Sequence, residues 1–428
     1  MSFNMPSGSR VYISPYNDIT RALSASLEGD IVFLGYIDNY KIGDGIIKAG
    51  QELEFDYVIV DSPNHWKEIS SQFESHQVLL HDKMNLKYVK LSEYESMLNE
   101  KLSFDVLLFP FNKSNIIDLS IVSRELKKLN ISSALVDLGS SKDINLKEGM
   151  LENNDVEFIF RDQIPYIEYR CLLTSNDWHS MCNDFFKRER ERGIITVGIV
   201  DGIEDFEDTD YKVKRYAYET TEYVLLMGSD DQFYFKHKID KTRVIGLPKL
   251  WDIYHTPVSF PEKTLVMINL NFTYGYFESE RDEWFNLVVS ACNELGYEYI
   301  VSQHHADNGF VAKERKSTKN VYETIQAASI VVSRFSTVIL ESLASGKPVV
   351  YFNPHGEKVK IYKEPRGAYQ LATTKEELKV ALLAGLKNKA DIHQRAHNFL
   401  DAKCFVSSSC PPGKAAANYI CELLSNSK

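Results

Sequence analysis

The sequence has few cysteines, and their spacing fits neither a metal site nor a redox pair. Six cysteines occur in 428 residues, and no two of them are separated by only two residues. This spacing excludes the common zinc-binding and thioredoxin-like patterns. The beginning of the chain is polar and has no apolar leader, so we expect free thiols in a reducing, cytoplasmic setting.

Long hydrophobic runs and an excess of basic residues are also missing. No apolar run approaches the ~18–20 residues that a membrane-spanning helix needs. The formal net charge of −11 argues against a general nucleic-acid-binding protein, which would carry a basic stripe. A local basic group does occur, and it is either a small-anion site or a solvated loop: Lys358, Lys360, Lys363 and Arg366.

Several sequence motifs of nucleotide-binding and hydrolytic enzymes are absent. No glycine-rich GxGxxG opens a first helix, and there is no P-loop, GxSxG or protein-kinase motif set. These absences exclude the common dehydrogenase, P-loop and serine-hydrolase classes. There is no HExxH, and the adjacent His304 and His305 would point apart on a strand. We therefore expect no metal and no cofactor.

What the sequence does have is a long alternation of short apolar runs with helical stretches. Many of these runs are continuously apolar, which is typical of parallel strands buried on both faces. A chain of this length implies two or three domains. The fold class predicted is α/β, with two Rossmann-like doubly wound domains facing a cleft. We place the domains at residues 1–243 and 244–405, followed by a C-terminal helix in 406–428 that packs back on the body.

The segment 333–351 carries the most information. It predicts a strand end, a polar turn, a helix that stops at Gly346, and a second strand. Ser333, Ser336 and Thr337 place hydroxyls before the helix, where backbone N–H groups and the helix dipole favour an anion. Glu341 lies one turn further on, where it could reach a ribose hydroxyl. The simpler interpretation is a helix cap and a solvated glutamate.

Other predicted strands of this half also end in hydrogen-bonding residues. Asn271 follows one strand, Gln303 and His304 follow a second, and Asn353 follows a fourth. Ligands of doubly wound sheets bind outside the carboxyl ends of the strands. Taken together, these residues predict a site for a nucleotide base and phosphate.

The first half supplies carboxylates near strand ends. Asp201 follows a predicted strand, Asp230 and Asp231 follow another after a Gly-Ser turn, and Glu157 lies on a third. A carboxylate in such a place can act as a general base or as a nucleophile at an anomeric carbon. The alternative is that these acids cap helices or lie in solvated turns.

Residues 244–351 resemble the C-terminal nucleotide-sugar domain of GT-B glycosyltransferases of bacterial surface polysaccharides. The matching pieces are the Ile-Gly-Leu-Pro entry at 245–248, the turn at 271–275 and the segment 333–351. Residues 35–41, 200–205 and 228–231 make the whole chain similar to the retaining β-Kdo transferase module of O-antigen synthases. Members of that family can carry further transferase modules.

The resemblance implies a metal-independent transferase that moves Kdo from CMP-Kdo to a lipopolysaccharide O-antigen or capsular glycan. The acceptor would be lipid-linked and the protein cytoplasmic, and a peripheral contact with the inner membrane stays open. Asp231 or Asp230 would be the nucleophile, and Glu157 or Asp201 would handle proton transfer. The sugar carboxylate or phosphate would pair with a cation from the set Arg161, Lys358 and Lys360.

Alternatives stay open at this point. The sequence does not reveal the nucleotide base, so another GT-B sugar transferase or a CDP-glycerol transferase fits as well. An isomerase similar to UDP-N-acetylglucosamine 2-epimerases would use the same architecture, with His304 as an acid–base group. A glycan-binding protein without catalysis is the remaining reading.

Overall fold

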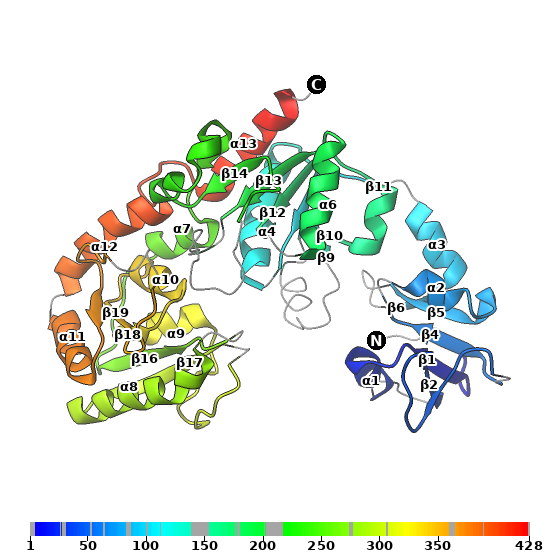
Figure 1. Cartoon of the computed structure of the whole chain (residues 1–428), viewed down its shortest axis with the longest axis horizontal. Coiled ribbons are helices and arrows are strands. Elements are labelled where there is room, and N and C mark those ends of the chain that lie inside the picture. The colour runs from blue at the N-terminus through cyan, green and yellow to red at the C-terminus, as the bar shows by residue number, and fades with distance from the viewer. Residues whose placement is uncertain are drawn as a thin grey trace. The chain divides into compact units, whose positions relative to one another are not determined.

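The structure is a computed structural model, shown in Figure 1. It describes residues 5–426 except 26, 28–30, 52–53, 63–64, 83–86, 100–101, 112, 138–152, 154, 176, 178–179, 201, 203–216, 274–276, 305–306, 359–363 and 388. The chain divides into two compact units, Met1–Leu173 and Thr174–Lys428. The domain boundaries expected at 243/244 and 405/406 stay predictions.

The first unit begins with a six-stranded sheet of order β3-β2-β1-β4-β5-β6. Its neighbouring strands pair in parallel, except that β5 and β6 are antiparallel. The strands are β1 (Arg10–Ser14), β2 (Val32–Ile37), β3 (Ile46–Ile47), β4 (Tyr57–Val60), β5 (Val78–Asp82) and β6 (Lys87–Lys90). The helices that follow them in sequence are α1 (Asp18–Ala25), α2 (Trp66–Ser70) and α3 (Leu91–Asn99).

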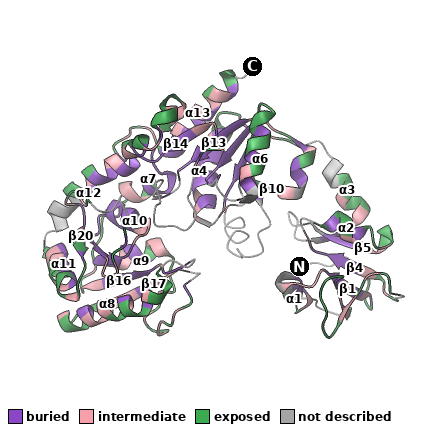
Figure 2. Cartoon of the chain, viewed as in Figure 1, coloured by how far each residue is buried: buried purple, intermediate pink, exposed green. Residues whose placement is uncertain are grey.

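Helices cover both faces of this sheet. Leu23 of α1 packs on one face against Val11 and Ile13, whereas Trp66 of α2 joins Val58 and Val60 on the other. The central strands are buried from both sides, which is why they read as continuous apolar runs (Figure 2).

A second sheet has seven strands in the order β10-β9-β8-β12-β13-β14-β15. They are β8 (Val106–Phe109), β9 (Ser133–Asp137), β10 (Glu157–Phe160), β12 (Cys171–Thr174), β13 (Ile195–Ile199), β14 (Tyr223–Leu226) and β15 (Thr242–Val244). The helices between these strands include α4 (Lys113–Lys128) and α6 (Ser180–Glu191), and β7 (Leu102–Ser103) pairs with β11 (Ile167–Glu168). The first half of the chain was expected to form one sheet, and it forms these two larger sheets instead. One sheet and two sheets produce the same alternation of strands and helices along the chain, so the sequence does not distinguish them.

The third sheet has five parallel strands in the order β17-β16-β18-β19-β20. They are β16 (Leu265–Leu270), β17 (Glu298–Gln303), β18 (Ile330–Ser333), β19 (Val349–Phe352) and β20 (Gln370–Ala372). The helices of this part are α7 (Pro248–His255), α8 (Arg281–Leu295), α9 (Val321–Ala327), α10 (Val338–Ala344), α11 (Lys375–Lys387), α12 (Lys389–Cys404) and α13 (Pro412–Asn426). The strand end, helix and second strand predicted within 333–351 are confirmed as the end of β18, α10 and β19.

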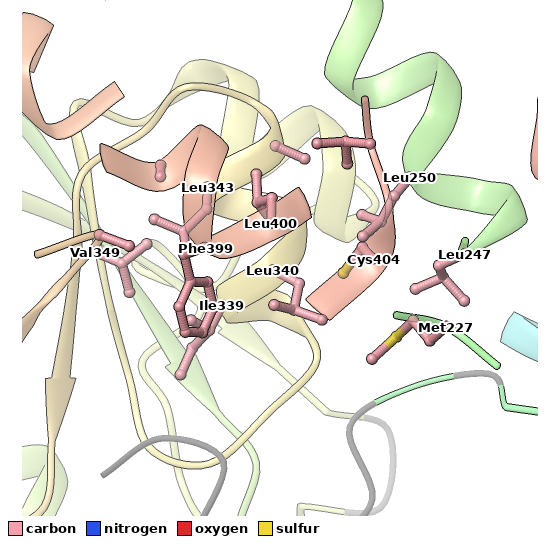
Figure 3. Close-up of a cluster of buried hydrophobic side chains, with 14 of the residues drawn as sticks. Met227, Leu247, Leu250, Ile339, Leu340, Leu343, Val349, Phe399, Leu400 and Cys404 are labelled. Atoms are coloured by element: carbon pink, nitrogen blue, oxygen red, sulfur yellow. The ribbon is translucent and has the colours of Figure 1, made fainter. Parts of the chain in front are cut away.

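One buried cluster connects α7, α10 and α12 with the end of β14 (Figure 3). Leu250 comes from α7, Leu340 from α10, Leu400 and Cys404 from α12, and Met227 follows β14. Burial of such side chains stabilises the fold by roughly 1.5–3 kcal/mol each. The cluster therefore holds α10 and the residues after β14 in a fixed arrangement within the second unit.

Candidate functional site

The carboxyl edge of the five-stranded sheet gathers the predicted polar residues. Because its strands are parallel, Asn271, Gln303, Ser333 and Asn353 all come to the same edge. Asn269 Nδ2 donates to Ser333 Oγ at 2.9 Å, and Asn271 Nδ2 donates to the Phe335 carbonyl at 3.3 Å. The structure brings these residues together, and their role in nucleotide binding stays a prediction.

Two of the predicted ligand-binding side chains are engaged in shaping loops. Gln303 Nε2 donates to the carbonyls of Asp307 and Gly309 at 2.9 and 2.7 Å. Ser333 is fully buried, and its hydroxyl donates to the Arg334 carbonyl at 2.7 Å. His304 is half-buried, and its backbone N–H donates to Leu270. These bonds hold the ends of β17 and β18 in place.

Arg334 and Glu357 form a buried ion pair that the sequence alone does not reveal. Arg334 Nε donates to Glu357 Oε1 at 2.5 Å, and both side chains are at most 5% exposed. Arg334 Nη1 also donates to the Asn271 carbonyl at 2.6 Å. Burial acts to raise the pKa of Glu357, but His355 and Arg334 outweigh it and hold the pKa below its usual value. The pair ties the loop after β19 to the turn after β18.

The turn into α10 carries Ser336 and Thr337. Ser336 Oγ accepts the Val338 N–H at 3.2 Å, whereas Thr337, the residue before the helix, makes no side-chain capping bond. Glu341 is buried in α10, and its carboxylate lies 3.6 Å from Lys249 Nζ of α7. Burial raises the pKa of Glu341, with Lys249 opposing it. The predicted contact of Glu341 with a ribose stays a prediction.

The carboxyl end of β13 meets the start of α10. A Cβ added to Gly202 would lie 2.8 Å from Thr337 Oγ1, so the Gly202 backbone packs directly against this hydroxyl. Only glycine permits so close an approach. The predicted catalytic residue Asp201 precedes Gly202 in sequence and lies outside the described residues.

Asp230 and Asp231 differ sharply in their surroundings, although they are neighbours in the 3-10 helix η3 (Ser229–Phe233). Asp231 is 2% exposed, and its Oδ2 accepts the N–H groups of Met227 and Gly228 at 3.0 and 3.2 Å. Asp230 is 26% exposed and pairs with Lys403 Nζ at 2.6 Å and Arg366 Nη2 at 3.0 Å. Asp231 therefore anchors η3 to the end of β14, whereas Asp230 presents its carboxylate to two cations.

A pocket of about 370 Å³ lies at these residues, within the size range of small-molecule sites. It is lined by Ser229, Asp230, Asp231, Phe233, Tyr234 and Lys403. Its back wall is the end of α12, because a Cβ at Gly228 would fall 2.2 Å from the Ala402 carbonyl oxygen. The absence of a side chain at Gly228 thus brings Lys403 next to Asp230.

Replacing Asp231 by Asn should change the pH dependence of stability. Burial raises the pKa of Asp231 to about 7, the two backbone N–H groups and Lys403 opposing it. The unfolded value is about 3.9. Between these values the folded chain keeps a proton that the unfolded chain has lost. The free energy of unfolding therefore falls as pH rises through this window, by at most about 1.4 kcal/mol per pH unit.

Asparagine has no proton to lose there, and its amide oxygen can accept the same two N–H bonds. We expect Asp231→Asn to gain melting temperature relative to the wild type between pH 5 and pH 8, as measured by differential scanning fluorimetry. Asp252→Asn, an exposed change on α7, is the control. If the difference in melting temperature between Asp231→Asn and the wild type were the same at pH 5 and pH 8, the raised pKa of Asp231 would be contradicted.

The other residues predicted for the site are Glu157, Arg161, Lys358 and Lys360. Glu157 is the exposed first residue of β10, at the amino end of the strand, so it does not lie at a carboxyl edge as expected. Arg161 begins the 3-10 helix η2 (Arg161–Tyr166) directly after β10. Both belong to the first unit. Lys358 is exposed in the second unit, and Lys360 lies outside the described residues.

Two further features bear on the site. In the part of the chain that the structure describes, no group of three or more His, Cys, Asp or Glu side chains is arranged to hold a metal ion. Over the same residues, no helix combines the length and the apolar character needed to cross a bilayer.

No family model and no curated protein matches the sequence. Solved structures do match. A wall teichoic acid polymerase TagF soaked with CDPG has a TM-score of 0.50 and 14% identity, over 85% of this chain and 96% of that one. UDP-GlcNAc 2-epimerase from Neisseria meningitidis bound to UDP-GlcNAc has a TM-score of 0.53 and 10% identity, over 76% of this chain and 100% of the epimerase.

The chain has a GT-B fold. A putative UDP-N-acetylglucosamine 2-epimerase from Listeria monocytogenes agrees, with a TM-score of 0.52 and 12% identity over 76% of this chain and 96% of that chain. The α/β class and the GT-B type expected from the sequence are thus confirmed. At such low identity the likeness establishes only the fold, so the reaction has to be inferred from the residues of this chain. About a quarter of the chain has no counterpart in the epimerases.

Proposed function

We propose that this GT-B protein is a glycosyltransferase acting on a nucleotide-activated sugar. The observation that carries the proposal is the contact of Gly202 with Thr337, since it joins the carboxyl ends of β13 and β18. Ligands of doubly wound sheets bind at such ends. The nucleotide would lie along Asn271, Ser336 and Thr337.

The finer proposal is a retaining transfer of Kdo from CMP-Kdo, and the sequence resemblance supports it. In the first step a carboxylate of η3 bonds to the anomeric carbon, while the bond to the phosphate oxygen breaks and CMP leaves with the electron pair. In the second step an acceptor hydroxyl displaces the carboxylate and gives its proton to a base. Asp201 remains the proposed base, because Glu157 lies at the amino end of β10, and the acceptor is proposed to be a lipid-linked glycan.

Of the two neighbouring aspartates, Asp230 suits the nucleophile better. Both aspartates border the pocket, but Asp230 is partly exposed, whereas Asp231 is 2% exposed and its Oδ2 accepts two backbone N–H groups. Lys403 and Arg366, which pair with Asp230, could also take the carboxylate of a sugar acid. These two cations complement the predicted set of Arg161, Lys358 and Lys360.

A thermal-shift screen with CMP, CDP, UDP and GDP tests the donor. A ligand at a hundredfold excess over its dissociation constant adds about 2.7 kcal/mol to the stability of the native state. We expect CMP to raise the melting temperature more than UDP or GDP at equal concentration, and stabilisation by UDP without CMP would overturn the Kdo proposal. CMP is the leaving group of both CMP-Kdo and CDP-glycerol, so turnover separates these two donors: release of CMP from CDP-glycerol but not from CMP-Kdo would favour the CDP-glycerol donor.

The second candidate is an isomerase similar to UDP-N-acetylglucosamine 2-epimerases. His304 at the carboxyl end of β17 favours it, because an imidazole there could move a proton at the sugar. Incubation with UDP-N-acetylglucosamine in deuterated water distinguishes the two. Deuterium at C2 without any transfer to an acceptor would establish the isomerase and remove the transferase.

A further inference from the structure

The first sheet of the chain has a ligand-binding topology of its own. From β1 the chain moves outward through β2 to β3, then returns to the other side of β1 to form β4. The order of the strands therefore reverses between β1 and β4. In doubly wound sheets this reversal leaves a crevice at the carboxyl ends of the two strands, and ligands bind there.

A pocket of about 380 Å³ occupies this place. It lies at the ends of β1, β2 and β4 and is closed by α2, and its volume falls in the range of small-molecule sites. The lining residues are Ser14, Pro15, Ile37, Asp38, Asn39, Tyr40, Ser62, His65, Glu68, Ile69 and Gln72. All of them belong to the first unit, whereas η3 and the five-stranded sheet belong to the second.

The pocket is unsuited to a phosphate. The turn from β1 into α1 has no glycine, and its Tyr16 N–H already donates to the buried Asp38 carboxylate at 3.1 Å. The same carboxylate accepts the N–H groups of Tyr40 and Lys41 at 2.9 and 3.0 Å. Neither lysine nor arginine is among the lining residues, and Glu68, which lies 3.6 Å from Nδ1 of the lining His65, adds a second carboxylate. The carboxylates disfavour an anionic ligand.

The remaining lining groups suit hydroxyls. Asn39 Nδ2 donates to Gln72 Oε1 at 2.9 Å, and Gln72 Nε2 donates to the Glu68 carbonyl at 3.1 Å, so the two carboxamides are held in place. Carboxamides offer both donors and acceptors to neighbouring hydroxyls, and carboxylates offer acceptors. The ring of Tyr40 is 90% exposed at this pocket and provides an apolar face.

We propose that this pocket is a binding site for a neutral saccharide. Its polar groups match an array of hydroxyls, its negative charge selects against nucleotides and sugar acids, and Tyr40 covers the apolar face of a sugar ring. The inference does not depend on the transfer reaction, because it uses only residues of the first unit.

Saturation-transfer NMR on the full chain tests the proposal. The probes are glucose, galactose, mannose, rhamnose and N-acetylglucosamine, each with CMP as a competitor. We expect at least one sugar to bind, CMP to leave its signal unchanged, and hydrogen exchange to slow in residues 38–41 and 65–72. Gln72→Ala and Tyr40→Ala should each weaken binding at least tenfold at unchanged melting temperature.

Gln51→Ala is the matched control, since Gln51 is exposed in the same unit and does not line the pocket. It should bind like the wild type, and so should Asp230→Asn. Three results would overturn the proposal: no binding of any probe sugar at millimolar concentration, binding unaffected by both pocket variants, or displacement by CMP. Sugar binding lost in Asp230→Asn alone would assign the saccharide to the second unit instead.

Discussion

Asp230→Asn is expected to abolish transfer and the covalent sugar adduct, while Asp231→Asn keeps both. Asparagine cannot attack the anomeric carbon, so the rate should fall roughly a thousandfold or more, about 4 kcal/mol of activation free energy. Asp231 is buried with two backbone N–H bonds, and asparagine can maintain them. Intact-protein and peptide mass spectrometry with CMP-Kdo alone should find the adduct on the peptide containing residues 228–233.

Nucleotide binding separates loss of chemistry from loss of folding. Both variants should bind CMP as the wild type does, because the proposed nucleotide residues belong to the five-stranded sheet. The opposite ranking, with Asp231→Asn inactive and Asp230→Asn active, would make Asp231 the nucleophile. Near wild-type transfer by both variants would rule out a double displacement at η3, and Asp201 would then be tested as the base of an inverting reaction.

Arg334→Met is expected to produce the largest loss of stability. Removing the arginine takes away the guanidinium partner of Glu357, whose side chain is 2% exposed, and leaves the carboxylate with His355 at 3.5 Å and hydrogen bonds from the Tyr351 hydroxyl and the Phe335 N–H. Breaking a buried ion pair from one side costs about 3–5 kcal/mol. For a unit of this size that corresponds to a fall of roughly 6–20 °C in melting temperature. Calorimetry would measure it.

Two variants control this experiment. Arg315→Met removes one partner of an exposed pair, Arg315 and Glu298, and should cost less than about 1 kcal/mol. The double change Arg334→Met with Glu357→Gln removes the uncompensated charge, so it should be more stable than Arg334→Met alone. Equal losses for Arg334→Met and Arg315→Met would show that the buried pair contributes nothing special to the fold.

The sequence was most informative about local structure. Continuous apolar runs such as those of β16 and β18 can be satisfied only by strands covered on both faces, so the α/β class followed directly. Within 333–351 the helix expected to stop at Gly346 ends at Ala344 and the expected second strand is β19, because caps and turn residues act over a few positions. Because parallel strands end at the same edge of a sheet, the sequence also predicted that the polar residues following the strands of the five-stranded sheet would lie together.

Only the tertiary structure determined the contacts of these residues, and with them their proposed roles. Asp230 and Asp231 are adjacent and chemically identical in the sequence, and they differ because Asp230 forms ion pairs with Lys403 and Arg366, far along the chain, whereas Asp231 is buried against two backbone N–H groups. The pairing of Glu341 with Lys249 and of Arg334 with Glu357 depends in the same way on distant partners. The division of the first half into two larger sheets was likewise invisible, because alternation records the order of strands and not their neighbours. Burial and charge pairing arise from contacts between distant segments, so they are properties of the folded chain.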